Sequence, residues 1–360
     1  MSPLTEILRA RIAHDGPLPL DAYMQACLLD PAHGYYTTQT SIGAAGDFTT
    51  APEISQMFGE MLGLALAQCW LDQGRPAAFL LAELGPGRGT LMADILRATR
   101  AVPGFHAAAQ ILLIEASPRL REAQRAQLAG HAPRWAEDLS DLPPLPLFAV
   151  ANEFFDALPI RQFRRAEGET WQERVVTATE DGGLAPDWAA PHPLAALDYR
   201  LGDTTPGDVV ELSPEAQGWA AALGQQITRQ GGAALILDYG DARSFGDTFQ
   251  ALRHHGFADP FAAPGQADLT AHVDFGELAR AALPAATTRL ETQGVFLERL
   301  GITARAQALA KGLSGAALDA HVAAHRRLTH PEEMGTLFKI LALTPPGQRP
   351  PPGLEPGLRP

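Results

Sequence analysis

Lysine and cysteine are both scarce in this 360-residue sequence. Lysine occurs only at positions 311 and 339, so arginine supplies nearly all of the positive charge, and the formal net charge is −13. Because nucleic-acid binding depends on clustered lysine and arginine, we expect no nucleic-acid partner. The two cysteines, Cys27 and Cys69, lie in apolar surroundings without a cysteine or histidine at metal-binding spacing, so we expect buried thiols and no metal site.

Long apolar segments are also missing. No stretch approaches the roughly 18 apolar residues of a membrane-spanning helix, and the N-terminus lacks the apolar centre of a signal peptide. Glu6 and Asp15 argue against a transit peptide, because such peptides are poor in acidic residues. The sequence therefore predicts a soluble protein that stays in the cytoplasm, without stable insertion into a membrane.

What the sequence does contain is a regular alternation of apolar runs and helix-like stretches. The apolar runs cover residues 79–84, 111–116, 145–152 and 233–240. Apolar strands without polar alternation are typical of a parallel sheet that is covered on both faces. We therefore predict an α/β fold with a doubly wound, mostly parallel sheet.

The rest of the chain departs from this alternation in three places. Residues 1–75 are predicted to form an N-terminal helical cover over the main domain, which spans 76–343. Residues 157–212 are predicted to be an insertion that contains a half-exposed hairpin. Residues 344–360 are rich in proline and glycine, so we predict a disordered tail.

The stretch AELGPGRGT joins the first apolar run to a predicted helix. Gly85, Gly87 and Gly89 permit a tight turn and close approach of a ligand to the main chain. A dinucleotide fingerprint has a glycine at the sixth position, where this sequence has Thr90. Glu83 would repel a pyrophosphate but suits the ammonium and sulfonium of S-adenosylmethionine. The alternative is a strand-to-helix turn in which the glycines only allow close packing.

Two further acids follow the next apolar run. Glu115 lies at a strand end, where it can accept hydrogen bonds from both ribose hydroxyls, and Ser117 opens the following helix. Asp138 is a candidate to accept a hydrogen bond from the adenine amino group. Solvated acids at a strand end and in a surface turn are the alternative interpretations of these two residues.

Three polar residues end the third apolar run, in AVANEFFDALP. Asn152, Glu153 and Asp156 are expected at the carboxyl edge of the sheet, where open α/β sheets bind ligands. Their alternative role is to cap the segment that follows.

Eight blocks in order resemble the MidA-like family of S-adenosylmethionine-dependent methyltransferases. They are GDFTTAPEISQMFGE, ELGPGRGTLMADILR, IEASPRLREAQ, ANEFFDALP, LILDYGD, GDTFQALRHH, DLTAHVDF and MGTLFKIL, and the resemblance as a whole covers nearly residues 4–343. The resemblance implies a class I methyltransferase fold, Rossmann-like, with a seven-stranded sheet whose last hairpin is reversed. It also implies S-adenosylmethionine as cofactor. Mitochondrial members of the family dimethylate an arginine of a complex I subunit symmetrically, so the resemblance implies protein-arginine methylation and a complex I subunit-like acceptor.

Carried over by position, the resemblance implies that the glycine loop holds the methionine moiety and Glu115 the ribose. The block at 46–55 would close over the cofactor. In that block, Thr50 and Glu53 also fit a capping box at the start of a helix over 53–72. The predicted cofactor-binding residues are Glu83, Gly85, Pro86, Gly87, Gly89, Thr90, Glu115, Ser117, Asp138, Asn152, Thr49 and Thr50.

Methyl transfer from a sulfonium is an in-line displacement, so positioning the acceptor is most of the work. For an arginine acceptor, we predict that Glu153 and Asp156, with Asp47 or Glu53 opposite, hold the guanidinium; these four are the predicted catalytic residues. Two alternatives remain open at this point. One is a non-catalytic assembly factor for a respiratory complex that binds the cofactor, and the other is an NAD-dependent oxidoreductase.

Overall fold

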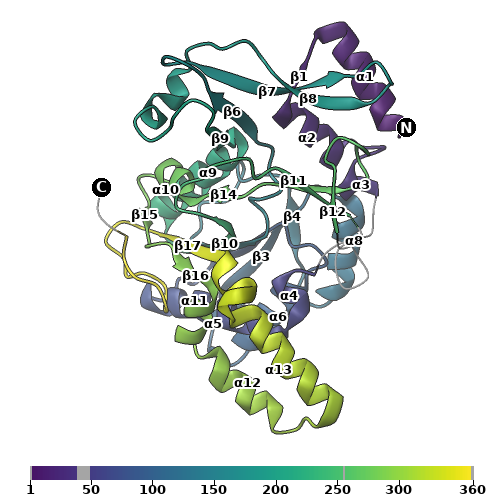
Figure 1. Ribbon diagram of the computed structural model, residues 1–360. Helices are drawn as coiled ribbons and strands as arrows, with labels where there is room; N and C mark the ends of the chain where they lie inside the picture. Colours follow the sequence, from purple (N-terminus) through teal and green to yellow (C-terminus); the bar gives the residue numbers. More distant parts are fainter. Residues whose placement is uncertain (1, 39–48, 254–255, 358–360) are drawn as a thin grey trace.

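The computed structural model describes residues 2–38, 49–253 and 256–357, and a nine-stranded mixed sheet lies at the centre of this part (Figure 1). Its main strands, in spatial order, are β15 (Ala286–Thr287), β17 (Phe338–Thr344), β10 (Gly232–Asp241), β5 (Leu147–Asn152), β2 (Phe79–Leu84), β3 (Ala109–Ile114) and β4 (Arg134–Ala136). Strands β4, β3, β2, β5 and β10 run parallel, whereas β17 is antiparallel to β10 and β15.

Two very short strands complete this sheet. β14 (Val273–Asp274) pairs with β10, and β16 (Glu291–Thr292) pairs with β17. The predicted α/β class is therefore observed, with a mixed sheet of nine described strands where seven were expected. Two-residue strands are too short to leave an alternation pattern in a sequence, so they could not be predicted from it.

Helices cover both faces of the central sheet, and β2 shows how. Phe79 and Leu81 belong to one hydrophobic core, whereas Leu80 and Ala82 belong to a second core on the opposite face. Successive side chains of a strand point to opposite faces, so a strand between two cores is apolar throughout. The helices that contribute to the first core include α4 (Ala51–Ile54), α5 (Gln56–Asp72), α6 (Thr90–Thr99), α7 (Phe105–Ala108), α11 (Gln293–Arg299), α12 (Ile302–Ala310) and α13 (Gly315–Thr329). Those of the second core are α9 (Pro214–Gln230) and α10 (Phe275–Ala281).

A separate five-stranded sheet contains most of the predicted insertion. Its strands are β1 (Leu18–Pro19), β7 (Trp171–Ala178), β6 (Arg161–Arg165) and β9 (Val209–Leu212) in spatial order, with β8 (Leu184–Trp188) paired to β7. The predicted hairpin is present, because β6 and β7 are antiparallel with Phe163 opposite Glu173. Phe163 and Trp171 are buried with Leu197, which lies in the short helix η1 (Ala195–Arg200). The insertion therefore has a small core of its own.

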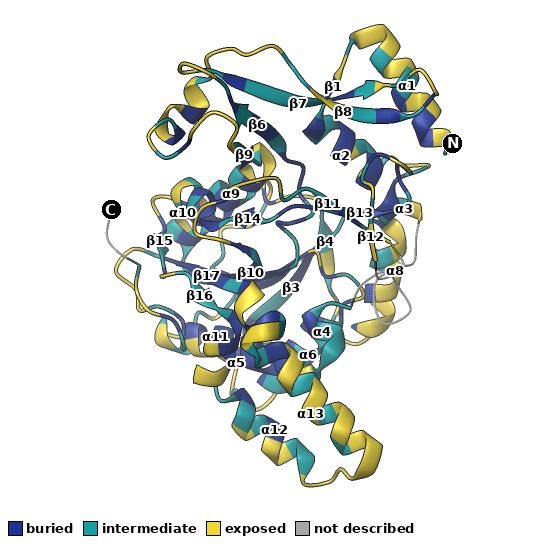
Figure 2. Ribbon diagram, in the orientation of Figure 1, coloured by how far each residue is buried: buried dark blue, intermediate teal, exposed yellow. Residues whose placement is uncertain are grey.

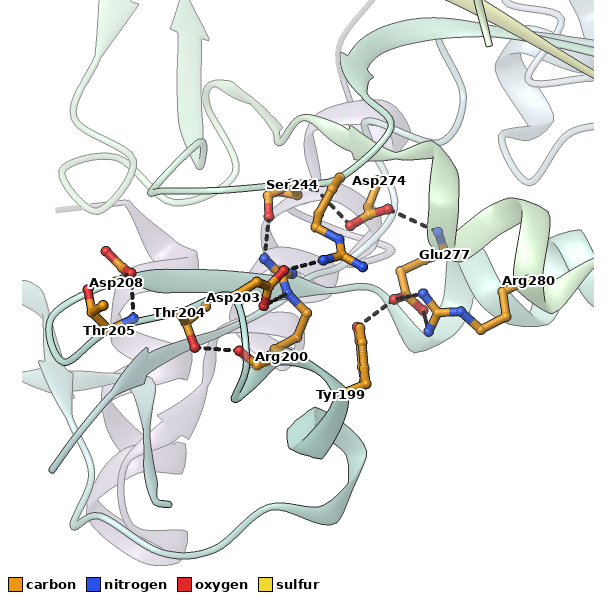
Figure 3. A network of polar contacts seen from close by, with 11 residues as sticks. Tyr199, Arg200, Asp203, Thr204, Thr205, Asp208, Ser244, Asp274, Glu277 and Arg280 are labelled. Atoms are coloured by element: carbon orange, nitrogen blue, oxygen red, sulfur yellow. Dashed lines mark hydrogen bonds and ion pairs between the residues drawn. The ribbon is translucent and has the colours of Figure 1, made fainter. Parts of the chain in front are cut away.

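A buried arginine fastens this insertion to the main domain (Figure 3). The guanidinium of Arg200 donates from Nε to Asp203 and from Nη2 to the carbonyl oxygen of Ser244, each over 3.1 Å. The N–H of Ser244 in turn donates to Asp274, which also caps α10. Because Arg200 is fully buried, removing one of these partners would leave polar groups of the guanidinium unsatisfied.

The N-terminal part is divided between the two sheets. α1 (Pro3–Asp15) and α2 (Leu20–Leu29) share a core with the insertion and with a three-stranded sheet of β12 (Gly256–Ala258), β11 (Gln250–Arg253) and β13 (Asp268–Thr270). α3 (Tyr35–Thr38) follows α2, and α4 (Ala51–Ile54) precedes α5 on the main sheet. α8 (Pro118–Gln127) connects β3 to β4. Helices α1 to α3 of the N-terminal part therefore pack with the insertion and the three-stranded sheet, whereas α4 and α5 pack on the central sheet.

The predicted helix over 53–72 is interrupted at its start. Ser55 is extended, with φ −161° and ψ 137°, so α4 ends before it and α5 begins after it. Thr50 makes no side-chain capping bond, so the predicted capping box is wrong. The carboxylate of Glu53 instead accepts a hydrogen bond from the Thr90 hydroxyl over 2.6 Å. A contact between distant segments has replaced the local one.

The C-terminal tail is packed as far as residue 357, which corrects the prediction of disorder over 344–360. Leu354 is buried in the first core, and the N–H of Arg289 donates to the carbonyl oxygen of Glu355 over 2.9 Å. One apolar anchor and backbone bonds to the segment after β15 are enough to hold a chain whose composition suggested disorder. Figure 2 shows that α13, which precedes η2 (Pro331–Gly335), is exposed along much of its length, whereas α12 beside it is mostly intermediate or buried. No described helix is both long and apolar enough to span a membrane.

Candidate functional site

A cavity of about 310 Å³ opens at the carboxyl ends of β2, β3 and β5. Open α/β sheets bind their ligands at this edge. The cavity is lined by most of the predicted site residues, namely Thr50, Glu53, Glu83, Gly85, Pro86, Gly87, Thr90, Glu115, Ser117, Asn152 and Glu153. One cavity therefore brings together most of the residues that the sequence predicted for the site, although several of them have other hydrogen-bond partners than expected.

The glycine loop turns sharply between β2 and α6. Gly85, Gly87 and Gly89 all have positive φ, of 63°, 50° and 85°. A Cβ on Gly85 would lie 2.9 Å from Cδ2 of Phe154, so the loop needs glycine there for space as well as for conformation. Gly89 does not line the cavity; it precedes α6 and faces Gln124 behind the loop.

Glu83 is a buried carboxyl at the end of β2. Among the described residues, its Oε2 has no hydrogen-bond partner. Burial raises the pKa of Glu83 to about 8, although the N–H of Met92 opposes the shift. A buried acceptor without a donor is costly, so this position suits a ligand that brings a cationic N–H group.

Glu115 is held in place by its neighbours at the end of β3. Its Oε1 accepts the N–H of Ser117 over 2.8 Å, and its Oε2 accepts the side-chain amide of Gln124 over 3.1 Å. The same amide donates to the carbonyl oxygen of Gly87 over 2.7 Å, and the indole of Trp135 donates to Gln124. Burial raises the pKa of Glu115. Gln124 thus ties this acid to the glycine loop, a role that nothing in the local sequence pattern indicated.

Asp138 does not line the cavity. It is exposed, and its Oδ1 accepts the N–H of Ser140 over 2.8 Å and the hydroxyl of the same residue. The neighbouring Glu137 lines the cavity instead. The geometry therefore favours the surface-turn interpretation of Asp138 over contact with an adenine.

Glu153 stands on the loop after β5 in an unusual backbone conformation. Its φ is 52°, a left-handed value that is rare for residues other than glycine. Its Oε1 accepts the N–H of Ala51 and the side-chain amide of Asn152, each over 3.1 Å. Burial, and then the charge of Asp156, raises the pKa of Glu153 to about 8. The carbonyl oxygen of the Asn152 side chain is buried without a partner among the described residues.

Asp156 lies behind the cavity wall rather than on it. Its Oδ2 accepts the hydroxyl of Tyr239 over 2.7 Å, and burial raises its pKa to about 6. Asp238, fully buried within β10, accepts the N–H groups of Phe155 and Asp156 over 3.0 and 3.2 Å. Tyr239 and Asp238 were missed at the sequence level, although LILDYGD marked a strand end at this edge.

The remaining predicted residues belong to the N-terminal part of the chain. Glu53 lines it while bonded to Thr90, and Thr50 lines it as well. Thr49 is described but does not line the cavity, and Asp47 lies outside the described residues. Tyr36 also lines the cavity, with its hydroxyl donating to Asp268 over 2.6 Å.

The cavity is strongly acidic. Its charged lining in the described chain consists of Arg88 and the six glutamates Glu53, Glu83, Glu115, Glu137, Glu153 and Glu215. Such a surface favours cationic ligands. In the same part of the chain, no group of three histidine, cysteine, aspartate or glutamate side chains is arranged to hold a metal ion.

The family to which the chain belongs is consistent with this site. A family model described as "Putative S-adenosyl-L-methionine-dependent methyltransferase" matches residues 61–294, and the chain belongs to this family. The fold is therefore that of an S-adenosylmethionine-dependent methyltransferase, and the cofactor is S-adenosylmethionine. The predicted family and cofactor are confirmed, and the NAD-dependent alternative is set aside.

Individual relatives resemble the chain over nearly its whole length. The Drosophila melanogaster protein named "Protein arginine methyltransferase NDUFAF7 homolog, mitochondrial" is 35% identical over 378 residues, covering 95% of this chain and 85% of its own. The Homo sapiens protein named "Protein arginine methyltransferase NDUFAF7, mitochondrial" is 34% identical over 372 residues, covering 96% of this chain and 84% of its own. A Burkholderia thailandensis crystal structure bound to S-adenosyl-homocysteine is 28% identical with a TM-score of 0.81, covering 97% of this chain and 93% of its own.

The same comparison corrects one prediction. The relatives are named as mitochondrial proteins, so the predicted cytoplasmic localisation is wrong. The prediction rested on the acidic residues Glu6 and Asp15 near the N-terminus. Such residues bear on whether a targeting peptide is present, but they carry no information about the folded domain that these relatives share.

Proposed function

We propose that this methyltransferase transfers methyl groups to an arginine side chain of a protein. The observation that carries the proposal is the acidic inner end of the cavity, where Glu153 lies beside the unpartnered side-chain oxygen of Asn152. A guanidinium has five N–H donors and no acceptor, so it complements a carboxylate and an amide oxygen. The name of the relatives, protein arginine methyltransferase, supports the same acceptor.

The residues at the other end of the cavity fit the cofactor. We propose that Glu83 binds the ammonium of the methionine moiety, because its buried Oε2 lacks a donor among the described residues. The glycine loop from Gly85 to Gly89 and the start of α6 would contact the rest of that moiety, and Glu115 the ribose. When bound, S-adenosylmethionine supplies a methyl group on a positively charged sulfur.

In the proposed mechanism Glu153 is the catalytic residue. It holds the guanidinium and accepts the proton that the reacting nitrogen loses, while a nitrogen–carbon bond forms and the carbon–sulfur bond breaks. Its pKa of about 8 makes its carboxylate a stronger base than an exposed glutamate, which suits proton transfer near neutral pH. The bonds from Ala51 and Asn152 fix the carboxylate before the acceptor arrives.

The other predicted catalytic residues take different roles in this proposal. Asp156 contacts Tyr239 instead of the cavity, so we assign it a positioning role that acts on Glu153 through its charge. Glu53 is bonded to Thr90 at the glycine-loop side, so we place it near the cofactor. Asp47 keeps its predicted role as an untested proposal.

The division of the chain follows from the same assignment. We propose that residues 1–75 cover the cofactor, because α2, α3 and α4 all contribute lining residues, and that 76–343 form the catalytic domain. Symmetric dimethylation and a complex I subunit as the acceptor are the finer proposals, and they rest on the family resemblance.

The test is to identify the labelled residue. The purified protein is incubated with methyl-labelled S-adenosylmethionine and extract from a deletion strain, and the modified residue is mapped by mass spectrometry. Label on a protein arginine, absent with Glu153→Gln and retained with the exposed control Glu169→Gln, is the expected result. Label on another residue type, or label that persists in Glu153→Gln, would overturn the proposal.

A further inference from the structure

The cavity lining also contains apolar side chains from three separate segments. They are Leu29 of α2, Leu158 and Pro159 after β5, and Trp219 of α9. We call these four residues the outer wall. None of them belongs to the glycine loop or contributes a charge, so the contacts proposed above for the methionine moiety, the ribose and the acceptor nitrogen do not use them.

Two of the helices that carry the outer wall each contribute a pair of side chains to the cavity lining. Gln25 and Leu29 lie four residues apart on α2, and Glu215 and Trp219 lie four residues apart on α9. Residues at this spacing share one face of a helix. Leu29 is 40% exposed, which is high for a leucine that lines a cavity, so it stands at the rim.

The outer wall is continuous with the acid that we assign to the acceptor. The ring of Trp219 meets the ring of Phe154 edge to face, with centroids 5.3 Å apart, and Phe154 also lines the cavity. Phe154 directly follows Glu153 in the chain. A side chain that reaches Glu153 therefore brings its own neighbours in sequence toward Trp219, and Leu29 lines the same cavity.

We propose that the outer wall binds an apolar side chain directly beside the methylated arginine, so that the acceptor is an arginine within an apolar segment of a protein. This inference rests on the proposed function. No described residue of the outer wall is basic, and Glu215 beside Trp219 repels acidic neighbours of the acceptor. Burial of a leucine side chain against such a surface should favour leucine over serine by about tenfold in affinity.

The experiment uses peptides of the form Gly-Ser-Xaa-Arg-Xaa-Ser-Gly, labelled with fluorescein, in which Xaa is leucine, serine, lysine or aspartate. Binding to the whole protein is measured by anisotropy in the presence of S-adenosyl-homocysteine. Leucine peptides should bind about tenfold more tightly than serine peptides, and aspartate peptides most weakly. Equal binding of the leucine and serine peptides, or preference for lysine, would overturn the proposal.

Variants then assign any preference to the outer wall. Trp219→Ala and Leu29→Ser should each bring the ratio of leucine to serine affinity close to one, while the exposed control Leu64→Ser on α5 keeps it. Trp219→Phe, which retains an aromatic ring, should keep most of the preference. A leucine preference that survives in both Trp219→Ala and Leu29→Ser contradicts the assignment. Thermal unfolding of each variant confirms that the comparison is made on folded protein.

Peptides with a different acceptor residue test this inference independently of the proposed function. The same peptides are made with a central lysine, and methyl transfer from labelled S-adenosylmethionine is followed for both sets. Methylation of lysine but not arginine, with a leucine preference intact, contradicts the proposed function and supports the outer wall. Arginine methylation that is equal for all flanking residues supports the proposed function and contradicts the outer wall.

Discussion

The two ends of the cavity are built from the chain in different ways. The proposed cofactor end is formed mainly by one stretch, from Glu83 through the glycine loop to Glu115, supported by Gln124 of α8 and joined by Glu53 of α4. The acceptor end combines α2, the segment around Ala51, the loop after β5 and α9. Local turns therefore create the first end, whereas only the packing of distant segments creates the second.

Both ends nevertheless share one physical feature. Each holds a carboxyl whose pKa burial raises to about 8, Glu83 at one end and Glu153 at the other. Folding has removed these groups from water without a full set of partners, which is costly until a cation binds. The comparison predicts that the two acids respond alike to pH and differently to substitution.

The largest effect is expected for substitution of Glu153, which should impair catalysis at the acceptor end without affecting binding at the cofactor end. Glu153→Gln should lower kcat by about 10²–10³-fold, because the variant cannot accept a proton, while the Kd for S-adenosylmethionine stays within about twofold. Steady-state methyl transfer and isothermal titration calorimetry measure the two quantities. A kcat close to that of the native protein would show that Glu153 only binds.

The matching change at the cofactor end should act on binding. Glu83→Gln should raise the Kd for S-adenosylmethionine by about 10–100-fold, because a charged partner of the ammonium becomes neutral. Calorimetry measures the Kd, with Glu169→Gln as an exposed control. Unchanged affinity in Glu83→Gln would place the ammonium elsewhere.

The pH response tests the shared feature. An exposed glutamate titrates near 4.5 and these two near 8, so between these values the folded state holds more protons than the unfolded state. The free energy of unfolding contributed by Glu83 and Glu153 therefore falls as pH rises from about 4.5 to about 8. Cofactor binding favours ionised Glu83, so its affinity should rise over the upper part of that range.

Thermal unfolding and calorimetry across this pH range measure both slopes. Glu83→Gln should flatten the fall in stability and remove most of the rise in affinity, because its amide does not titrate. An affinity for S-adenosylmethionine that falls with pH in the native protein contradicts the assignment of Glu83.

The smallest expected effect lies within the cofactor end. Glu115→Gln should weaken cofactor binding by about tenfold, since Glu115 lines the cavity, while Asp138→Asn should change it by less than about twofold. The two Kd values, measured side by side, test whether the ribose is held at Glu115. Equal losses of cofactor affinity in both variants would indicate that Asp138 also contacts the cofactor.

How much of the structure could be predicted from the sequence depends on how far apart in the chain the interacting residues lie. The strand with residues 79–84, the glycine loop and the hairpin of β6 and β7 were predicted because short periodic patterns define them. The capping box at Thr50 failed because Glu53 found a partner in Thr90. Composition suggested a disordered tail, but Leu354 found a place in the core.

The sequence by itself determined the α/β class, the family, the cofactor and the acids at the strand ends. The α/β class depends on the alternation of apolar runs with helix-like stretches, and the acids and glycines on short local patterns, whereas the family and its cofactor follow from the resemblance of eight sequence blocks. Only the tertiary structure decided which acids line the cavity, that Asp238 and Tyr239 support the acceptor loop, and that α2 and α9 face the same cavity. Burial and partners of this kind arise between segments far apart in the chain, so no local pattern records them.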